Sequence, residues 1–285
     1  TAIGAYGIQV EDVVNLNSKV YNNTIRVETA GPSEGNPSAF RVTGPIGSNI
    51  EIYNNNFTAV TTSASANAYA GYFTNLFGVN GTYLNIHDNL FRGNNIIIDY
   101  GYDANNITMA SNTLDRILPT VGIPYTIYHE SYASGSDIRR SIGNYLINKI
   151  VLNGADLENA RYGTGENEHF ISWYLNTSVT NGVSSINGAS VEARDVFNSL
   201  IFSGTTDSQG RVVATLKDFR RYSAVGNSTS VRTDYNNYTV TITASGYNSN
   251  VSTITMDQSK PHDVVLTALT VVCGNGIVEG AEQCD

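Results

Sequence analysis

Apolar and polar residues in the first half of the chain follow a short pattern that returns four times. An apolar residue stands three positions before an asparagine, and a second one stands two positions after it. The copies are VYNNTI ending at Ile25, IYNNNF ending at Phe57, IHDNLF ending at Phe91 and MASNTL ending at Leu114. Repetition of this kind predicts a solenoid, in which every copy forms the same corner of one turn of chain.

The residues around each asparagine predict a strand that enters a corner and a second strand that leaves it. Alternating apolar and polar residues are typical of a strand with one buried face. Stacked copies would place equivalent side chains in columns about 4.8 Å apart. The column before the corner contains Val20, Ile52, Ile86 and Met109.

The corner column contains Asn23, Asn55, Asn89 and Asn112, which are 32, 34 and 23 residues apart. We expect each to adopt a left-handed backbone, which costs Asn less than most other residues. We also expect their side-chain amides to form a hydrogen-bonded ladder. Asn144 in SIGNYL is the predicted fifth copy. Together these features predict an all-β fold with a right-handed parallel β-helix of about five coils over residues 1–164.

The repeats resemble the pectate-lyase-like superfamily of parallel β-helices. That superfamily includes lyases and hydrolases as well as many proteins that are not enzymes, so the resemblance implies a fold and leaves the activity open. Catalysis on such a fold needs acids close together on one sheet. Hydrolysis uses a separated pair of carboxylates, and elimination uses calcium-binding carboxylates with a Lys or Arg base.

Four residues are weak candidates for such catalysis: Asp88, Asp99, Asp103 and Arg92. Asp99 and Asp103 lie in one short segment with two tyrosines, and Asp88 lies half a coil earlier. However, no carboxylate occupies the position of Asp88 in the neighbouring copies, and Arg92 would meet Asp115 in a surface ion pair. These residues leave open whether the chain is an enzyme. We expect them to have structural or glycan-contacting roles more than catalytic ones.

After Gly165 the repeats give way to turn pairs such as Asn181-Gly182 and Asn187-Gly188, with about seven short alternating runs between them. This spacing predicts a β-sandwich over residues 165–270. The stretch from Asn187 to Leu216 resembles the carboxypeptidase regulatory-like family of immunoglobulin-type sandwiches. The residues that carry this resemblance are Gly188, Ala189, Val191, Gly204, Thr206, Asp207 and Gly210. The resemblance implies a fold and brings no catalytic residue with it.

The tail, residues 271–285, contains both cysteines, Cys273 and Cys284. It resembles the start of a Myxococcus-type cysteine-rich repeat, truncated here. A disulfide between the two would contribute about 2 to 3 kcal/mol and requires an oxidising compartment. The resemblance implies Glu279, Glu282 and Asp285 as candidate calcium ligands, although solvated acids are the simpler interpretation. No other metal or cofactor is expected, because two cysteines without a neighbouring histidine do not make a zinc site.

Charge and composition restrict the classes of binding partner that we expect. Only 14% of the 285 residues are charged, and the formal net charge of -9 opposes binding to phosphate backbones, so nucleic acid is not an expected partner. The longest apolar run, 264–273, is about half the length that spans a bilayer, so no membrane insertion is expected. The chain lacks an initial Met and a signal sequence, which favours a mature or excised fragment.

Eight sequons predict N-glycosylation and secretion, although a chain rich in Asn, Ser and Thr also produces such triplets by chance. Their asparagines are Asn22, Asn56, Asn80, Asn106, Asn176, Asn227, Asn237 and Asn250. We therefore expect an extracellular structural or adhesive protein of a prokaryotic cell surface. An uncapped solenoid end predicts head-to-tail self-association into a filament or surface layer, and glycans or a neighbouring cell are possible partners. The alternatives are a secreted polysaccharide lyase or glycoside hydrolase, and a non-catalytic glycan-binding module.

Overall fold

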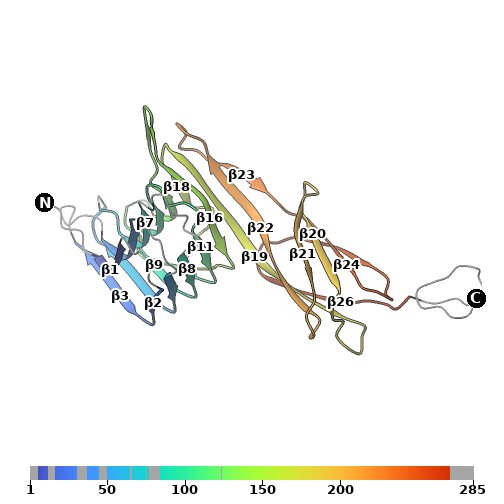
Figure 1. Cartoon of the computed structure of the whole chain (residues 1–285). Helices are drawn as coiled ribbons and strands as arrows, with labels where there is room; N and C mark the ends of the chain where they lie inside the picture. Colours follow the sequence, from blue (N-terminus) through green and yellow to red (C-terminus); the bar gives the residue numbers. More distant parts are fainter. Residues whose placement is uncertain are drawn as a thin grey trace, which may run out of the picture. The chain divides into compact units, whose positions relative to one another are not determined.

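The computed structural model confirms that the chain is all-β. It describes residues 6–11, 17–30, 37–44, 50–64, 66–74, 76, 84–122 and 124–269. Within these ranges the regular elements are strands, and no helix occurs (Figure 1). The strands form two compact units, which are Thr1–Ile171 with Arg220–Thr233, and Ser172–Phe219 with Asp234–Asp285.

The first unit is built on three sheets. Sheet A contains β1 (Tyr6–Glu11), β4 (Ser38–Thr43), β7 (Tyr69–Thr74), β10 (Ile96–Tyr100), β13 (Tyr125–His129) and β18 (Ala160–Tyr162). Sheet B contains β2 (Ser18–Tyr21), β5 (Ile50–Tyr53), β8 (Leu84–His87), β11 (Thr108–Ala110) and β16 (Arg140–Ile147), followed by β19 (Glu166–Thr180), β22 (Arg211–Ser223) and β23 (Val231–Asp234). Sheet C contains β3 (Thr24–Thr29), β6 (Asn56–Thr61), β9 (Leu90–Gly93), β12 (Thr113–Arg116) and β17 (Ile150–Leu152).

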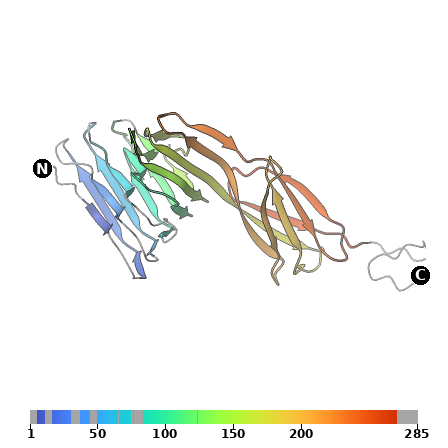
Figure 2. The ribbon, with the colours of Figure 1, turned by 45° about the horizontal axis from the view of Figure 1, so that its top comes forward.

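The chain visits sheets A, B and C in rotation, and we call one such visit a round. Strands of successive rounds pair in parallel throughout sheets A and C and from β2 to β16 in sheet B. They lie side by side in Figure 2. A two-stranded antiparallel hairpin, β14 (Ala133–Ser134) with β15 (Asp137–Ile138), interrupts the fifth round.

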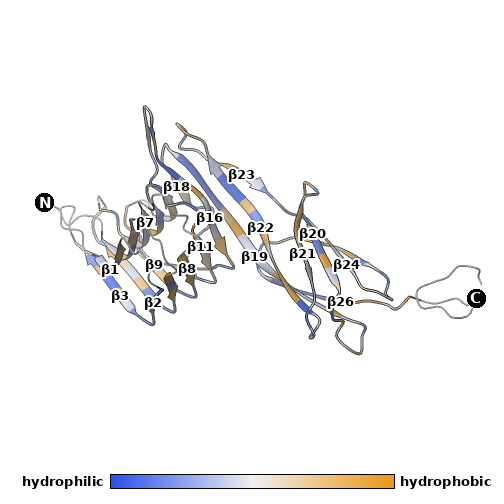
Figure 3. Ribbon diagram, viewed as in Figure 1, coloured by the Kyte–Doolittle hydropathy of each residue, from blue (hydrophilic) through white to orange (hydrophobic). Residues whose placement is uncertain are grey.

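The predicted apolar columns form the core of the first unit. Val20 pairs with Ile52, Ile52 with Ile86, and Ile86 with Met109, so the column is continuous. Aromatic rings stack beside it: Phe57 lies 4.7 Å from Phe40 and 5.4 Å from Phe91 between ring centroids. Hydrophobic residues gather on the strands of this unit in Figure 3.

The corner asparagines do not adopt the left-handed backbone that we predicted. The residues immediately before them do, namely Asn22, Asn54, Asp88 and Ser111, with φ between 53° and 56°. The prediction was wrong by one position, because the asparagine after the bend turns its side chain into the stack, where it bonds to the neighbouring rounds.

The asparagine ladder itself is confirmed. Asn23 donates to Asn55 Oδ1 from its side-chain Nδ2 at 3.0 Å, Asn55 donates to Asn89 at 2.9 Å, and Asn89 donates to Asn112 at 2.9 Å. The backbone N–H of each upstream asparagine donates to the same Oδ1 atoms at 2.9 to 3.0 Å. Each side-chain amide therefore holds the corners of consecutive rounds together.

The fifth member of the ladder is Lys149, and the prediction of Asn144 was wrong. β11 pairs with β16 so that Ala110 faces Ile147, which places Lys149 opposite Asn112. The buried Lys149 Nζ donates to the carbonyls of Met109 and Ile147. Asn144 lies five residues earlier, where its Oδ1 accepts from the Ile107 N–H at 3.0 Å.

The second unit contains a four-stranded antiparallel sheet. Its strands are β21 (Leu200–Thr205), β20 (Ser190–Arg194), β24 (Tyr238–Thr243) and β25 (Asn250–Ile254), while β26 (Lys260–Val265) pairs with β19. Each of the seven predicted runs overlaps one of these strands or β22. Alternate residues such as Val191, Ala193, Val240 and Ile242 are buried, and hydropathy alternates along β20 and β22 in Figure 3.

Candidate functional site

A single row of side chains crosses sheet A from β4 to β18. The strand register places Arg41 opposite Tyr72, Tyr72 opposite Asp99, Asp99 opposite Tyr128, and Tyr128 opposite Arg161. We call this set, with its central carboxyl group, the Arg–Tyr–Asp row. Parallel strands lie about 4.8 Å apart, so the two arginines flank Asp99 at about 10 Å on either side.

The row lies on the face of sheet A opposite the core, because side chains alternate along a strand. Ile98 and Tyr100 on either side of Asp99 are fully buried, and the Tyr100 ring packs 6.1 Å from Phe73 and 5.2 Å from His129. These inward positions are what fix the backbone of β10. The sequence therefore has to place Asp99 away from the core.

Each arginine of the row lies over a tyrosine ring. Arg41 Cζ is 5.3 Å from the centroid of Tyr72, and Arg161 Cζ is 5.2 Å from that of Tyr128. A guanidinium group is attracted to the face of an aromatic ring at such distances. The stacking holds both cations next to the tyrosines.

Asp99 is fully buried, and neither of its carboxylate oxygens has a hydrogen-bond partner among the described residues. Burial raises the pKa of this carboxyl group well above 3.8, and the nearby charge of Glu130 raises it further. On β4 of the same sheet, Ser38 Oγ and Arg41 Nε are buried without partners in the described structure. Unpaired buried polar atoms are rare, so their concentration on one sheet marks a candidate site.

Glu130 follows β13 and is the second acid near the row. The Tyr72 hydroxyl donates to Glu130 Oε2 at 3.1 Å. Burial raises the pKa of Glu130, and the Tyr72 hydrogen bond with the charges of Arg161 and Arg41 partly oppose that shift. Burial also raises the pKa of Tyr128 to about 12. The site thus offers two carboxyl groups with raised pKa values, next to tyrosines and two cations.

The four predicted catalytic candidates differ in their surroundings. Asp99 belongs to the Arg–Tyr–Asp row, whereas Asp103 Oδ2 pairs with Arg139 at 3.0 Å. Asp88 lies at the corner between sheets B and C, where its Oδ2 is 2.8 Å from Nδ1 of the preceding histidine. Asp88 therefore lies at another corner of the first unit, and the predicted grouping of Asp99 with Asp103 stays a prediction.

Arg92 does pair with Asp115, with Nε 2.8 Å from Oδ2, as the column alignment predicted. We expected this ion pair to lie on the surface, and only Arg92 does so. The Arg92 side chain is 41% exposed and that of Asp115 is 6% exposed. Asn153 donates a second hydrogen bond to Asp115 at 2.7 Å. This pair joins two strands of sheet C and is separate from the Arg–Tyr–Asp row.

Sequence reasoning missed Arg41, Arg161 and Glu130. A signal was present in the alternation of sheet A, where Arg41 stands between Phe40 and Val42 just as Asp99 stands between Ile98 and Tyr100. The repeated corner pattern belongs to sheets B and C, so it does not extend to sheet A.

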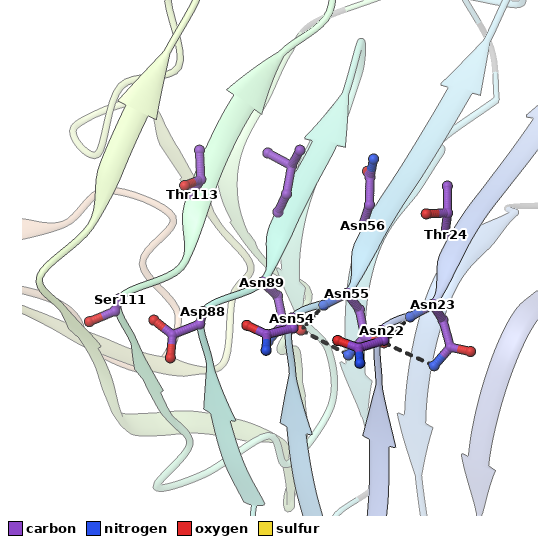
Figure 4. Close-up of a pocket in the computed structure, with 11 residues that line it drawn as sticks. Asn22, Asn23, Thr24, Asn54, Asn55, Asn56, Asp88, Asn89, Ser111 and Thr113 are labelled. Atoms are coloured by element: carbon purple, nitrogen blue, oxygen red, sulfur yellow. Dashed lines mark hydrogen bonds between the residues drawn. The ribbon is translucent and has the colours of Figure 1, made fainter.

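A second candidate is an open groove along the corner between sheets B and C, with a volume of about 590 Å³. We call it the corner groove. In Figure 4 the four left-handed residues follow one another along it, next to the asparagine ladder. Its lining comprises Asn22, Asn23, Thr24, Asn54, Asn55, Asn56, Asp88, Asn89, Leu90, Ser111 and Thr113.

The predicted modification and tail residues are only partly described. Asn22, Asn176, Asn227 and Asn237 are exposed, and Asn56, Asn106 and Asn250 are partly exposed. Asn80, both cysteines and the three tail acids lie outside the described residues, so the disulfide and the calcium site stay predictions. Within the described ranges, no group of three His, Cys, Asp or Glu side chains is arranged to hold a metal ion.

Comparison with known proteins adds no relative. Neither the models of known protein families nor the curated proteins include a match to this chain. The family resemblances drawn from the residues therefore stay predictions. Among the described residues there is no helix long and apolar enough to cross a membrane.

Proposed function

We propose that the chain is part of an extracellular structural or adhesive protein of a prokaryotic cell surface. In this proposal the first unit is a right-handed parallel β-helix, and the second is an immunoglobulin-type sandwich of the carboxypeptidase regulatory-like kind. The role is mechanical: the chain spans distance and presents side chains or sugars for contact. Its partners are other copies of the chain and glycans of neighbouring surfaces.

The observation that carries this proposal is the continuity of the asparagine ladder through the stacked rounds. Asn55, Asn89 and Asn112 are buried, and the first two both accept and donate along the stack. A satisfied buried polar network makes a structure rigid and specifies one arrangement. Rigidity of this kind along one direction suits a load-bearing or spacing element.

The first round supports self-association. In the described part of the chain, β1, β2 and β3 each form an edge of their sheet. The three belong to one round, so their sheet edges lie at the same end of the stack, and strand edges favour pairing with another chain. Tyr6 and Tyr21 on these strands are 45% and 49% exposed. Such a contact joins two different surfaces and propagates into a filament or lattice.

Electron microscopy and light scattering of the purified protein test this proposal over a range of concentrations. We expect assemblies that lengthen with concentration, and we expect Val10→Lys on β1 to shorten them by adding a charge at the edge. Val183→Lys in the second unit is the charge-changing control, because Val183 is 96% exposed and does not belong to the first round. Uniform monomers at the highest concentration reached would contradict the proposal.

The Arg–Tyr–Asp row favours a second candidate, a secreted polysaccharide lyase or glycoside hydrolase. General acid catalysis needs a carboxyl group whose pKa lies near the working pH, and burial shifts Asp99 and Glu130 in that direction. Glycosidases use two carboxyl groups. In this alternative Asp99 donates the proton, Glu130 is the second acid, and the arginines hold the glycan.

A screen of neutral and acidic polysaccharides, read by product formation, tests the second candidate. We expect Asp99→Asn and Glu130→Gln each to lower any activity by about a hundredfold or more. Asp103→Asn is the matched control, because Asp103 pairs with Arg139 and is not a member of the row. Activity that survives both substitutions would remove the row from the mechanism.

A further inference from the structure

The corner groove presents the same chemistry at every round. Asn22, Asn54, Asp88 and Ser111 share one backbone geometry, with φ between 53° and 56°. They occupy equivalent positions on consecutive rounds, about 4.8 Å apart. The first three are exposed and Ser111 is partly exposed. A ligand lying along the groove would therefore meet a polar side chain at each step.

The groove is also held in place before any ligand arrives. Asn55 and Asn89 beneath it are 2% exposed, and each donates to two backbone carbonyls of its own and the preceding round. These bonds fix the corners that carry Asn54 and Asp88. Binding to a preorganised surface loses less affinity to ordering of the protein.

The charge of the groove selects among ligands. Asp88 is the only charged residue among the eleven that line it, and no Lys or Arg belongs to that set. The remaining polar groups are amides and hydroxyls, which both donate and accept hydrogen bonds. This composition disfavours acidic polymers and suits a ligand rich in hydroxyl groups that also carries a positive charge.

We propose that the corner groove binds a linear glycan containing amino sugars with free amino groups. An extended glycan advances by a length similar to the spacing of the rounds, so one sugar unit lies at each round. Hydroxyl groups bond to Asn22, Asn54 and Ser111, and one ammonium group pairs with Oδ1 of Asp88, since Asp88 Oδ2 lies 2.8 Å from His87 Nδ1. This inference gives the adhesive role a ligand and rests on that proposed function, although it does not require self-association.

Calorimetric titration of the whole chain with a chitosan hexamer tests the proposal, with the fully N-acetylated hexamer and an oligogalacturonate for comparison. We expect the chitosan hexamer to bind most tightly. Asp88→Asn should weaken binding about threefold to fivefold, which is the size of an exposed ion pair. Asn54→Asp should strengthen it by a similar factor, because Asp accepts the left-handed backbone and adds a second carboxylate.

Glu28→Gln is the matched control, because Glu28 is an exposed acid on β3 that does not line the groove. It should leave affinity unchanged. The proposal is overturned if Asp88→Asn binds as well as the parent, if Glu28→Gln weakens binding equally, or if the N-acetylated hexamer binds as tightly. A sugar found on Asn22 of the native protein would also overturn it, since the groove would already be filled. Microscopy of assemblies tests the structural role separately.

Discussion

At the scale of single residues, Asp99 is the least expected feature of the molecule. A buried carboxyl group without a hydrogen-bond partner opposes folding, because water solvates it in the unfolded chain. Its neighbours Tyr72 and Tyr128 do not provide a partner, and both arginines lie one strand further away. Natural proteins retain such groups mainly where they serve a function.

Replacement of Asp99 by Asn should stabilise the protein at neutral pH by about 1 to 3 kcal/mol. The pKa of Asp99 is higher in the folded protein than in the unfolded chain. The contribution of Asp99 to the free energy of unfolding is therefore fully present below the unfolded pKa of about 3.9, and it is lost as the pH rises toward the folded pKa. The advantage of Asp99→Asn should therefore be small at pH 4 and larger at pH 7. Urea unfolding at both pH values measures it, and a less stable variant at pH 7 would show that a partner exists.

At the scale of elements, the asparagine ladder connects sheet B to sheet C in every round from Asn23 to Asn112. Its members are not equivalent. Asn89 is 2% exposed and bonded to the rounds on both sides, whereas Asn23 is partly exposed and bonded on one side only. The cost of removing a member should follow this difference.

Asn89→Ala should lower the free energy of unfolding by about 2 to 4 kcal/mol, because it leaves the carbonyls of Ile52 and His87 and the N–H of Asn55 without partners. Asn23→Ala should cost about 1 kcal/mol or less, and it serves as the matched control. Chemical unfolding of the two variants compares them directly. Equal losses would mean that the ladder does not act as a continuous network.

Lys149 is the last member of the ladder, and its replacement by Asn is expected to stabilise the protein. Burial lowers its pKa well below 10.5, and it has no acceptor atom for the backbone N–H of Asn112. Lys149→Asn should raise the free energy of unfolding by about 1 kcal/mol, because it supplies an acceptor for the Asn112 N–H and removes a buried ionisable amine. Lys149→Met should lower it, since the carbonyls of Met109 and Ile147 lose their donor. Thermal unfolding measures both, and a stabilising Met would contradict the donor role.

At the scale of the whole molecule, stability in acid depends on two histidines inside the first unit. His129 Nε2 lies 3.0 Å from His169 Nδ1, and His129 Nδ1 lies 2.9 Å from Ser141 Oγ. Both rings are fully buried, which lowers the pKa of His129 well below 6.5 and that of His169 to about 3. The folded protein thus keeps both rings neutral where the unfolded chain would protonate them.

His169→Phe should gain stability relative to the parent as the pH falls from 6.5 to 5. A lowered folded pKa means that the unfolded chain binds more protons in this range, so each such histidine costs about 1.4 kcal/mol per pH unit. The gap between variant and parent isolates this effect, because other groups such as Asp99 contribute equally to both. Unfolding curves at three pH values measure the gap, and a constant gap would show that the histidine is not held neutral.

The sequence alone was sufficient for the pattern that repeats. Val20, Ile52, Ile86 and Met109 were expected to stack and do so, because one buried face imposes the same alternation on every strand. The asparagine ladder and the Arg92–Asp115 pair follow from that register. The left-handed residue was predicted one position too late, because the repeated pattern does not show which of the two adjacent residues at a corner has the left-handed backbone.

Other features were decided only by the tertiary structure. Lys149 takes the place expected of an asparagine, because its amine reaches the two carbonyls equivalent to those that Asn112 bonds to one round earlier. The Arg–Tyr–Asp row brings together residues from Arg41 to Arg161, and no local signal specifies a contact across such distances in the chain. The burial of Asp99, and its lack of a hydrogen-bond partner among the described residues, depend on what packs around it. Alternation fixes which side of a strand a residue occupies, whereas its charge and its neighbours are determined by the rounds stacked beside it.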